Sequence, residues 1–214
     1  TYKQNASTRP YHPNSVQLLK ETLIKSKEPV VLFPIGPLTN IASLISAYPE
    51  LKSKIRCISL MGGAFSHGNR SSAAEFNILS DPEAAQIVYE SGVPIVMSGL
   101  DITDQASLSQ TELERILEIG KADSKLLYDI FGLYASHDRN LHDPIAIMAI
   151  TDPELFEFVD VHVDVETGGH FAVGATIPDF RSKANPNASL VKVAMKLDHS
   201  AFVDRLIEIL RKDA

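Results

Sequence analysis

Polar side chains gather in one loop of this chain, directly after a strongly apolar run. The run Ile55–Met61 is followed by two glycines and then by Asn69, Glu75 and Asn77. A loop at the carboxyl end of a strand is where open α/β sheets bind small ligands. One carboxylate and two carboxamides can bind a pair of sugar hydroxyls, because together they offer donors and acceptors. The loop therefore predicts a site for a polyhydroxylated molecule.

The same loop has a second interpretation. Glu75 and Asn77 alternate around Phe76, so in an extended segment both side chains would point to the same side. A solvated loop whose polar groups bond its own backbone would show the same residues. The glycine pair 62–63 indicates only a tight turn or a close backbone approach. The spacing alone does not decide between the two interpretations.

The adjacent residues His142 and Asp143 form a second group that could carry chemistry. Asp143 precedes Pro144, so its carboxylate could simply cap a helix. The pair also offers a proton donor or acceptor of near-neutral pKa and a hard oxygen ligand for a cation. Thr39 is open to the same two interpretations, since its side chain could cap a helix while its backbone carbonyl stays free for a cation.

Other histidines and two aspartates are expected to be structural. Asp101 and Asp104 flank a loop at a strand end, and we expect them to cap that loop. Four histidines lack the spacing of metal ligands and are expected at the surface: His67, His137, His162 and His170. The sequence has no P-loop, no G-x-G-x-x-G and no G-x-S-x-G motif, so none of these patterns indicates a phosphate-binding loop or a serine nucleophile.

Alternating elements must position these residues. Strands are expected over 30–34, 55–61 and 93–97, and helices over 15–27, from the turn at 36–40 to about 48, and from 82 to about 91, where Asp81 is the cap. This order predicts βαβ units and a parallel sheet. The later part reads as helical over 108–135 and 143–150, then as strands over 159–165, 171–173 and 190–197, and finally as a helix over 201–211. We therefore predict an α/β fold with a mostly parallel open sheet flanked by helices and a β-rich C-terminal segment.

Length and charge limit the classes of function. The 214 residues, 44% of them hydrophobic, fit a single domain over 1–214. A net charge of −7 argues against nucleic acid and anionic membranes as partners, because both are acidic. The single cysteine, Cys57, excludes an internal disulfide framework and suits a reducing cytoplasm. With no apolar run of membrane-spanning length and no signal-peptide pattern, the chain is expected to be soluble and cytoplasmic.

A resemblance to a known family rests on several segments that occur in order. These segments are PIGPLTN (34–40), LMGG (60–63), AEFN (74–77), DPEAA (81–85), GLDIT (99–103) and HD (142–143). Together they resemble the nucleoside hydrolase family, the ribonucleoside hydrolases that prefer inosine and uridine in the broad sense. The chain looks most like bacterial pyrimidine or non-specific members, from about residue 15 onward. Purine or pyrimidine preference is not settled by these segments.

The resemblance implies a reaction and a cofactor. Family members hydrolyse the N-glycosidic bond of ribonucleosides to ribose and free base, and a calcium ion holds two ribose hydroxyls and the attacking water. By similarity, the Thr39 carbonyl and the Asp143 carboxylate are calcium ligands, and His142 lies near the leaving base as a candidate general acid. Tyr134 falls in the region that covers the base. The expected partners are a small ribonucleoside and further copies of the chain in a homodimer or homotetramer, with a role in nucleoside salvage.

The ribose-binding residues follow from the same resemblance. Asn69, Glu75 and Asn77 match the ribose-binding positions of the family, and Met61 lines the sugar pocket.

The sequence departs from the family in one respect. The family has a motif Asp-x-Asp-x-x-x-Asp-Asp after its first strand, which supplies most calcium carboxylates and the general base, whereas the first aspartate here is Asp81. The resemblance therefore implies a C-terminal portion without the first strands of the sheet, inactive alone unless the missing segment is supplied. The alternative is a catalytically incomplete fragment that serves only as a nucleoside- or ribose-binding or assembly module.

Overall fold

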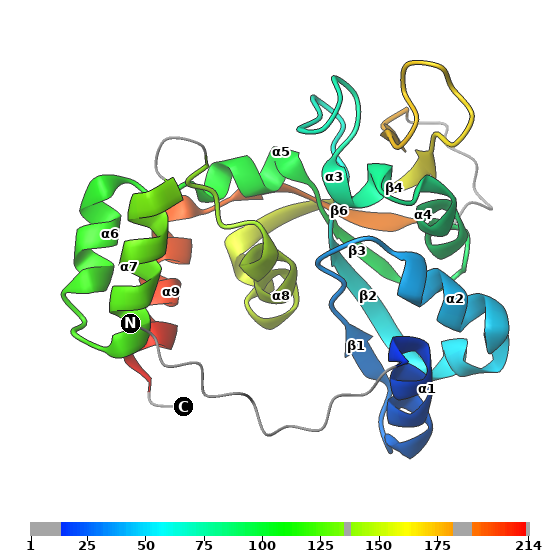
Figure 1. The fold of residues 1–214 in the computed structure, drawn as a ribbon, viewed down its shortest axis with the longest axis horizontal. Helices are drawn as coiled ribbons and strands as arrows, with labels where there is room; N and C mark the ends of the chain where they lie inside the picture. Colours follow the sequence, from blue (N-terminus) through cyan, green and yellow to red (C-terminus); the bar gives the residue numbers. More distant parts are fainter. Residues whose placement is uncertain (1–13, 135–137, 182–189, 213–214) are drawn as a thin grey trace.

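The computed structural model describes residues 14–134, 138–181 and 190–212, and within these ranges the strands form one mixed sheet (Figure 1). The strand order is β1-β2-β3-β6-β4-β5. The first four strands in this order are parallel, whereas β4 is antiparallel to both β6 and β5. The strands are β1 (Val30–Leu32), β2 (Ile55–Met61), β3 (Ile95–Ser98), β4 (Phe156–Val165), β5 (Thr176–Asp179) and β6 (Val191–Leu197). The predicted α/β class is confirmed.

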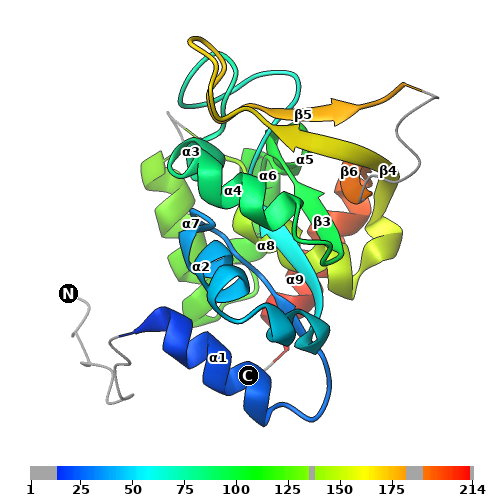
Figure 2. The same ribbon diagram turned by 90° about the vertical axis from the view of Figure 1, so that its right-hand side faces the viewer.

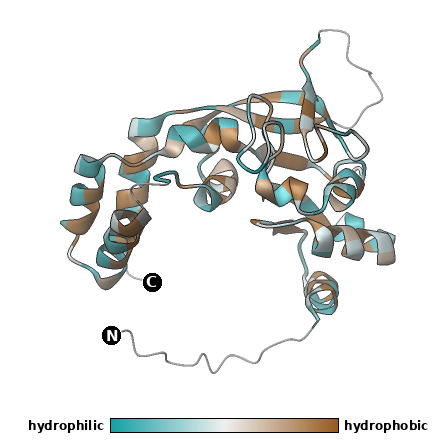
Figure 3. Cartoon of the chain, turned by 45° about the horizontal axis from the view of Figure 1, so that its top comes forward, coloured by the Kyte–Doolittle hydropathy of each residue, from teal (hydrophilic) through white to brown (hydrophobic). Residues whose placement is uncertain are grey.

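Helices lie on both faces of this sheet (Figure 2). They are α1 (Ser15–Lys25), α2 (Thr39–Ala47), α3 (Phe76–Leu79), α4 (Pro82–Tyr89), α5 (Leu100–Thr103), α6 (Gln110–Leu117), α7 (Ala122–Tyr134), α8 (Asp143–Thr151) and α9 (His199–Arg211), with short 3₁₀ turns η1 (Pro49–Lys54), η2 (Asp104–Ala106) and η3 (Pro153–Leu155). One core joins α1, α2 and α4 to the sheet, and a second core joins α6 to α9 to its other face. The helices carry both polar and apolar residues along their length (Figure 3), as expected when one side of each packs on a core.

Local chemistry explains the elements that carry the candidate site. β2 is buried along nearly its whole length, which is typical of a parallel strand covered on both faces. The helix α4 begins where predicted, because the Asp81 side chain accepts a hydrogen bond of 3.0 Å from the Ala84 N–H and Pro82 occupies the first helical position. The parallel strands β2 and β3 pair with each other, and Met61 at the end of β2 lies opposite Ser98 at the end of β3. Their carboxyl ends therefore meet at one edge of the sheet.

One predicted strand is wrong. Residues 170–173 form turns, and the strand that follows them and pairs with β4 is β5, in which Thr176 lies opposite Val165. The Glu166 carboxylate accepts hydrogen bonds from the N–H groups of Gly168 and Gly169, both 2.8 Å long. The turn is longer than the Thr-Gly-Gly pattern indicates because the Gly174 N–H donates to the Glu166 carbonyl over 2.7 Å. It ends at Gly174, whose φ of +81° favours glycine.

Two further differences concern boundaries. The region predicted as helical over 108–135 contains two helices, α6 and α7, which are separated near Gly120 with a φ of +76°. The strand β3 begins at Ile95, two residues later than predicted, since Pro94 has no N–H to give to a ladder. In the described part of the chain, we find no helix with the length and apolar character needed to cross a membrane.

Candidate active site

The loops after β2 and β3 are held against each other at the carboxyl edge of the sheet. The Gly62 N–H donates to the Ser98 carbonyl over 3.1 Å, and the Leu100 N–H donates to the Gly63 carbonyl over 2.9 Å. Gly63 has a φ of +80°, and a Cβ there would lie 2.8 Å from side-chain atoms of two neighbours. A larger residue at Gly63 would therefore strain the backbone and displace its neighbours.

Glu75 is the buried centre of the loop that follows β2. Its side chain is 2% exposed, and its carboxylate accepts hydrogen bonds from three backbone N–H groups: Gly63 at 3.0 Å, Asn77 at 2.8 Å and Ile78 at 3.1 Å. The carboxylate thus caps α3 and also fixes the start of the loop. A charged acceptor with three amide donors is a strong and directional anchor.

The two carboxamides of the loop lie on either side of this anchor. The Asn77 Nδ2 donates to the Met61 carbonyl over 3.0 Å and lies 3.3 Å from the Met61 sulfur, while the Asn69 Oδ1 accepts from the Phe76 N–H over 2.9 Å. The structure thus brings Met61, Asn69, Glu75 and Asn77 together. Hydrogen bonds to the backbone, the second interpretation of the loop, are present for all three polar side chains.

The segment of Glu75 and Asn77 is not extended, so the condition under which both side chains would point to the same side is not met. Glu75 is the cap of α3 and Asn77 lies inside that helix, so the two side chains are not related by the alternation of a strand. The physical reason is the cap itself, because an acceptor at Glu75 satisfies the first free N–H groups of a helix. Within the described residues, no hydrogen bond occupies the Asn77 Oδ1 or the Asn69 Nδ2.

His142 stands before the first turn of α8, and both ring nitrogens have partners. Nδ1 lies 2.8 Å from the Thr103 hydroxyl, and Nε2 lies 2.9 Å from an Asp138 oxygen. Burial acts to raise the pKa of the Asp138 carboxyl, but the hydrogen bonds from the Asn140 N–H and from His142 outweigh it, and the pKa is lowered. His142 is therefore held between α5 and the segment before α8.

Asp143 does not cap a helix, so that interpretation is wrong. It is already the first residue of α8, the cap position belongs to His142, and no side chain makes a cap hydrogen bond there. Partial desolvation raises the pKa of the Asp143 carboxyl, while the neighbouring His142 acts in the opposite direction. Ala146, three residues later on the same helix, packs in one buried cluster with Met61, which places the start of α8 beside the end of β2.

Thr39 does not cap its helix either. It is the first residue of α2, and its hydroxyl donates to the Asp81 carboxylate at the start of α4. Its carbonyl remains a predicted ligand. Across the residues that the structure describes, no three side chains of His, Cys, Asp or Glu are grouped so that they could hold a metal ion. These residues by themselves do not form a complete calcium site.

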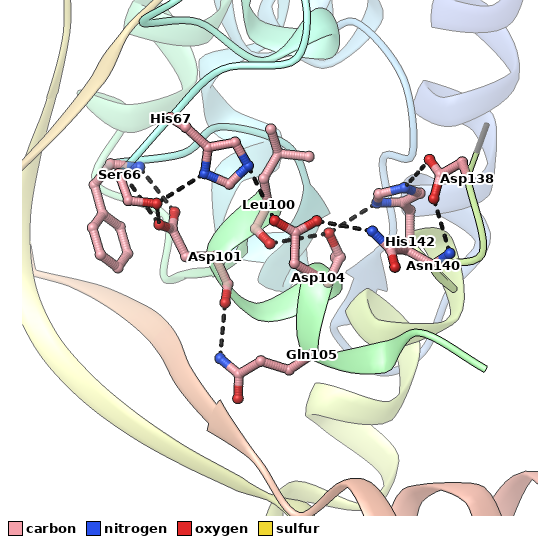
Figure 4. A network of polar contacts seen from close by, with 11 residues as sticks. Ser66, His67, Leu100, Asp101, Asp104, Gln105, Asp138, Asn140 and His142 are labelled. Carbon is pink, nitrogen blue, oxygen red and sulfur yellow. Dashed lines mark hydrogen bonds and ion pairs between the residues drawn. The ribbon is translucent and has the colours of Figure 1, made fainter. Parts of the chain in front are cut away.

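The loop that carries the ribose-binding candidates is also fastened from α5. The Asp101 carboxylate accepts from the N–H groups of Phe65 at 2.9 Å and Ser66 at 3.1 Å, so it caps the loop after β2 and not the loop after β3 that it flanks. Asp104 does not cap: its Oδ2 lies 3.0 Å from the His67 Nε2, and its Oδ1 accepts from the Asn140 Nδ2 at 2.9 Å (Figure 4). The sequence gives no sign of these contacts, because the partners are more than 30 residues apart.

Two hollows flank the site. One of about 200 Å³ is lined by Ile130, Phe131, Asp138 and Asn140, next to the Asp138 that holds His142. A larger one of about 480 Å³ lies between the outer side of the 64–67 loop and the turn before β5, and none of the predicted site residues lines it. The predicted Tyr134 is the last residue of α7, His162 and His170 lie outside the site, and His137 lies outside the described residues.

Comparisons with known proteins agree with the resemblance. The model of the family "inosine-uridine preferring nucleoside hydrolase" matches residues 1–204. The chain is 39% identical to the pyrimidine-specific ribonucleoside hydrolase RihA of Salmonella typhi over 216 residues, which covers 96% of this chain and 68% of that protein. RihA of Escherichia coli (strain SMS-3-5 / SECEC) is also 39% identical, over 94% of this chain and 68% of that protein.

Solved structures agree as well. The plant nucleoside hydrolase PpNRh1 is 28% identical with a TM-score of 0.87, over 100% of this chain and 71% of that chain. The purine-preferring ribonucleoside hydrolase from Gardnerella vaginalis is 31% identical with a TM-score of 0.82, over 94% of this chain and 66% of that chain. Because the family model matches residues 1–204 of the 214 in this chain and the RihA relatives are 39% identical to it, the chain belongs to the family of inosine-uridine preferring nucleoside hydrolases.

Proposed function

We propose that this ribonucleoside hydrolase binds the ribose of its substrate at the carboxyl end of β2 and cleaves the N-glycosidic bond to give ribose and free base. The observation that carries the proposal is the buried anchor Glu75, which fixes Asn69 and Asn77 around Met61 at the sheet edge. Small ligands bind at this edge in open α/β sheets. The hydrolase family to which the chain belongs gives the reaction.

Each residue of this group has a chemical role in the proposal. The Asn77 Oδ1 accepts a hydrogen bond from one ribose hydroxyl, and the Asn69 Nδ2 donates to an oxygen of the sugar. Glu75 accepts three backbone hydrogen bonds already and has capacity for about one more, since a carboxylate offers about four lone-pair sites. Met61, 5% exposed, forms the apolar floor under the sugar.

His142 acts on the leaving base in this proposal. Its imidazole is the proposed general acid, and Thr103 and Asp138 fix the orientation of the ring. Because these two residues occupy both ring nitrogens, one of the contacts must open before a proton can pass to the base. The hollow beside Asp138, lined in part by Ile130 and Phe131, offers an apolar wall for a planar base. Protonation of the base makes it a better leaving group as the sugar takes on oxocarbenium-like character.

Calcium is the proposed cofactor, with the Asp143 carboxylate and the Thr39 carbonyl as two of its ligands. Calcium takes six to eight oxygens, so these two residues supply only part of a coordination shell. The described residues contain no group of three metal-binding side chains, so further ligands would have to complete the site. A catalytically incomplete fragment that only binds ribonucleoside or ribose, or serves in assembly, is the second candidate, and the same observation favours it.

Reducing-sugar release from uridine, cytidine and inosine tests the proposal, in calcium with and without a chelator. Pyrimidine nucleosides come first because the RihA relatives are named as pyrimidine-specific. When a segment that carries the Asp-x-Asp-x-x-x-Asp-Asp motif is added, we expect turnover that the chelator abolishes and that Asn77→Ala reduces at least tenfold. The chain by itself should be inactive or nearly so. Glu83→Gln, an exposed change on α4, is the matched control. No turnover even with the added segment, together with measurable ribose or nucleoside binding by calorimetry, would favour the second candidate, a module that only binds.

Oligomeric state, cellular location and pathway complete the proposal. We expect a homodimer or homotetramer in the cytoplasm that serves nucleoside salvage, as the family resemblance implies. Light scattering of the purified chain measures the first of these, and a monomeric mass at micromolar concentration would contradict it.

A further inference from the structure

We propose that Asp104 is a positioning residue that couples the two halves of the candidate site. One half is the loop after β2, which carries the ribose-binding candidates, and the other is the segment before α8, which carries His142. The proposal rests on the proposed function of these two halves. Asp104 begins η2, directly after α5, and so lies between them (Figure 4).

Each carboxylate oxygen of Asp104 serves one half. Oδ2 lies 3.0 Å from the His67 Nε2 in the loop after β2, and Oδ1 accepts from the Asn140 Nδ2 at 2.9 Å in the segment before α8. A carboxylate can hold two such partners at once because each oxygen has its own lone pairs. No single neutral side chain of this length offers the same two acceptors.

The contacts continue to the candidate catalytic histidine. The Asn140 N–H donates to Asp138 over 2.9 Å, and the other oxygen of Asp138 lies 2.9 Å from the His142 Nε2. On the opposite side, the His67 Nδ1 lies 2.9 Å from the Ser66 hydroxyl. A continuous series of polar contacts therefore joins the loop after β2 to His142, and Asp104 is the link between the two segments.

The foundation under Asp104 is rigid. The next residue, Gln105, donates from its Nε2 to the Asp101 carbonyl at 2.8 Å and to the Met195 carbonyl at 2.9 Å, and its Oε1 accepts from the Leu197 N–H at 3.0 Å. These bonds tie η2 to β6. The position of Asp104 is thus fixed relative to the sheet. Its carboxylate can therefore fix the loop after β2 and the segment before α8 relative to the same sheet.

Asp101 provides a matched control. It lies on α5, is also an aspartate, and accepts hydrogen bonds from Phe65 and Ser66. Among the described residues its carboxylate is hydrogen-bonded to the loop after β2 but makes no hydrogen bond or ion pair with the segment before α8. Its loss should loosen one half of the site, whereas the loss of Asp104 should loosen both.

The test compares Asp104→Ala, Asn140→Ala and Asp101→Ala by amide hydrogen exchange and by the ¹⁵N and ¹H signals of the His142 ring. We expect Asp104→Ala to speed exchange about two- to fivefold in both 65–68 and 138–142, because the polar contacts that it loses are half-exposed and therefore weak, and to shift the His142 ring signals. Asn140→Ala removes the side-chain bond to Asp104 and keeps the backbone bond to Asp138. It should therefore change exchange in 138–142 and the His142 signals, and leave 65–68 unchanged. Asp101→Ala should affect only 65–68.

Two results would overturn the proposal. One is that Asn140→Ala and Asp104→Ala leave the His142 signals and the exchange of 138–142 as in the unsubstituted chain. The other is that Asp101→Ala changes them as much as Asp104→Ala does. If Asp104→Ala does not fold, Asn140→Ala decides by the same criteria. These measurements use no substrate. A failure to hydrolyse nucleosides would therefore refute the proposed reaction without affecting the exchange and NMR results that test the role of Asp104.

Discussion

Replacement of Glu75 should destabilise the chain far more than its single negative charge suggests. The carboxylate is 2% exposed and accepts three backbone N–H groups, two of them on the same oxygen. Glu75→Ala leaves all three donors without an acceptor, and each buried unpaired donor costs about 1–3 kcal/mol, part of which water entering the space recovers. We therefore expect a loss of about 3–4 kcal/mol in the free energy of unfolding.

Glu75→Gln separates the hydrogen bonds from the charge. Its one carbonyl oxygen can take the place of the oxygen that serves Gly63 and Ile78, but its NH₂ group then faces the Asn77 N–H, so two donors meet. The expected loss is about 1–2 kcal/mol, intermediate between the unsubstituted chain and Glu75→Ala. Urea unfolding followed by circular dichroism gives these values from the midpoint when the slope is unchanged.

Glu83→Gln is the matched control for this series. Glu83 lies exposed in the first turn of α4, where its charge is worth at most about 0.3–1 kcal/mol at the positive end of the helix. The reasoning is refuted if Glu75→Gln and Glu83→Gln destabilise equally, or if Glu75→Ala costs no more than either of them.

Further predictions concern pH and backbone geometry. The Thr151 hydroxyl, and then Arg205, lower the pKa of Asp152, so this residue stabilises the fold above the unfolded pKa of about 3.9, and that contribution is lost as the pH falls through the lower folded value. Asp152→Asn should cost about 1–3 kcal/mol at pH 7 and flatten the acid limb of a thermal-unfolding series; an unchanged acid limb would contradict this. Gly63→Ala should cost about 2–4 kcal/mol in urea unfolding, whereas Gly132→Ala, in open space on α7, should stabilise by about 0.5–1 kcal/mol; equal effects would refute the steric argument.

The sequence predicts best those elements whose causes are local. The bounds of β2 agree with the predicted 55–61, because a continuous apolar run between polar residues defines a buried parallel strand. The start of α4 agrees because Asp81 and Pro82 act within a few residues of themselves. The strand over 171–173 is wrong because a three-residue apolar stretch carries no information on its partner, and the hydrogen bond from the Gly174 N–H to the Glu166 carbonyl encloses these residues in a turn.

The candidate site shows the same limit. The residues predicted to bind ribose at the end of β2 do lie together, since the end of that strand and the loop after it contain all of them. Their geometry was not predictable, because the interpretation of Glu75 depends on whether residue 76 begins a helix. Contacts such as that between Asp104 and Asn140 join positions 36 residues apart, and no local pattern encodes a pairing at that distance.

The polar side chains of the loop after β2 can bond the backbone and bind a sugar at the same time. A ligand that meets side chains free to rotate must order them, which costs about 0.5–1.5 kcal/mol for each side chain immobilised. Here Asn69 and Asn77 each use one end of the carboxamide on the backbone, so the remaining end already has a fixed direction. Glu75 caps α3, and this helix contains both Asn77 and the Phe76 N–H that donates to Asn69. The backbone bonds therefore prepare the site for the ligand, and a variant that breaks them should weaken ribose binding even when it leaves the contacting atoms in place.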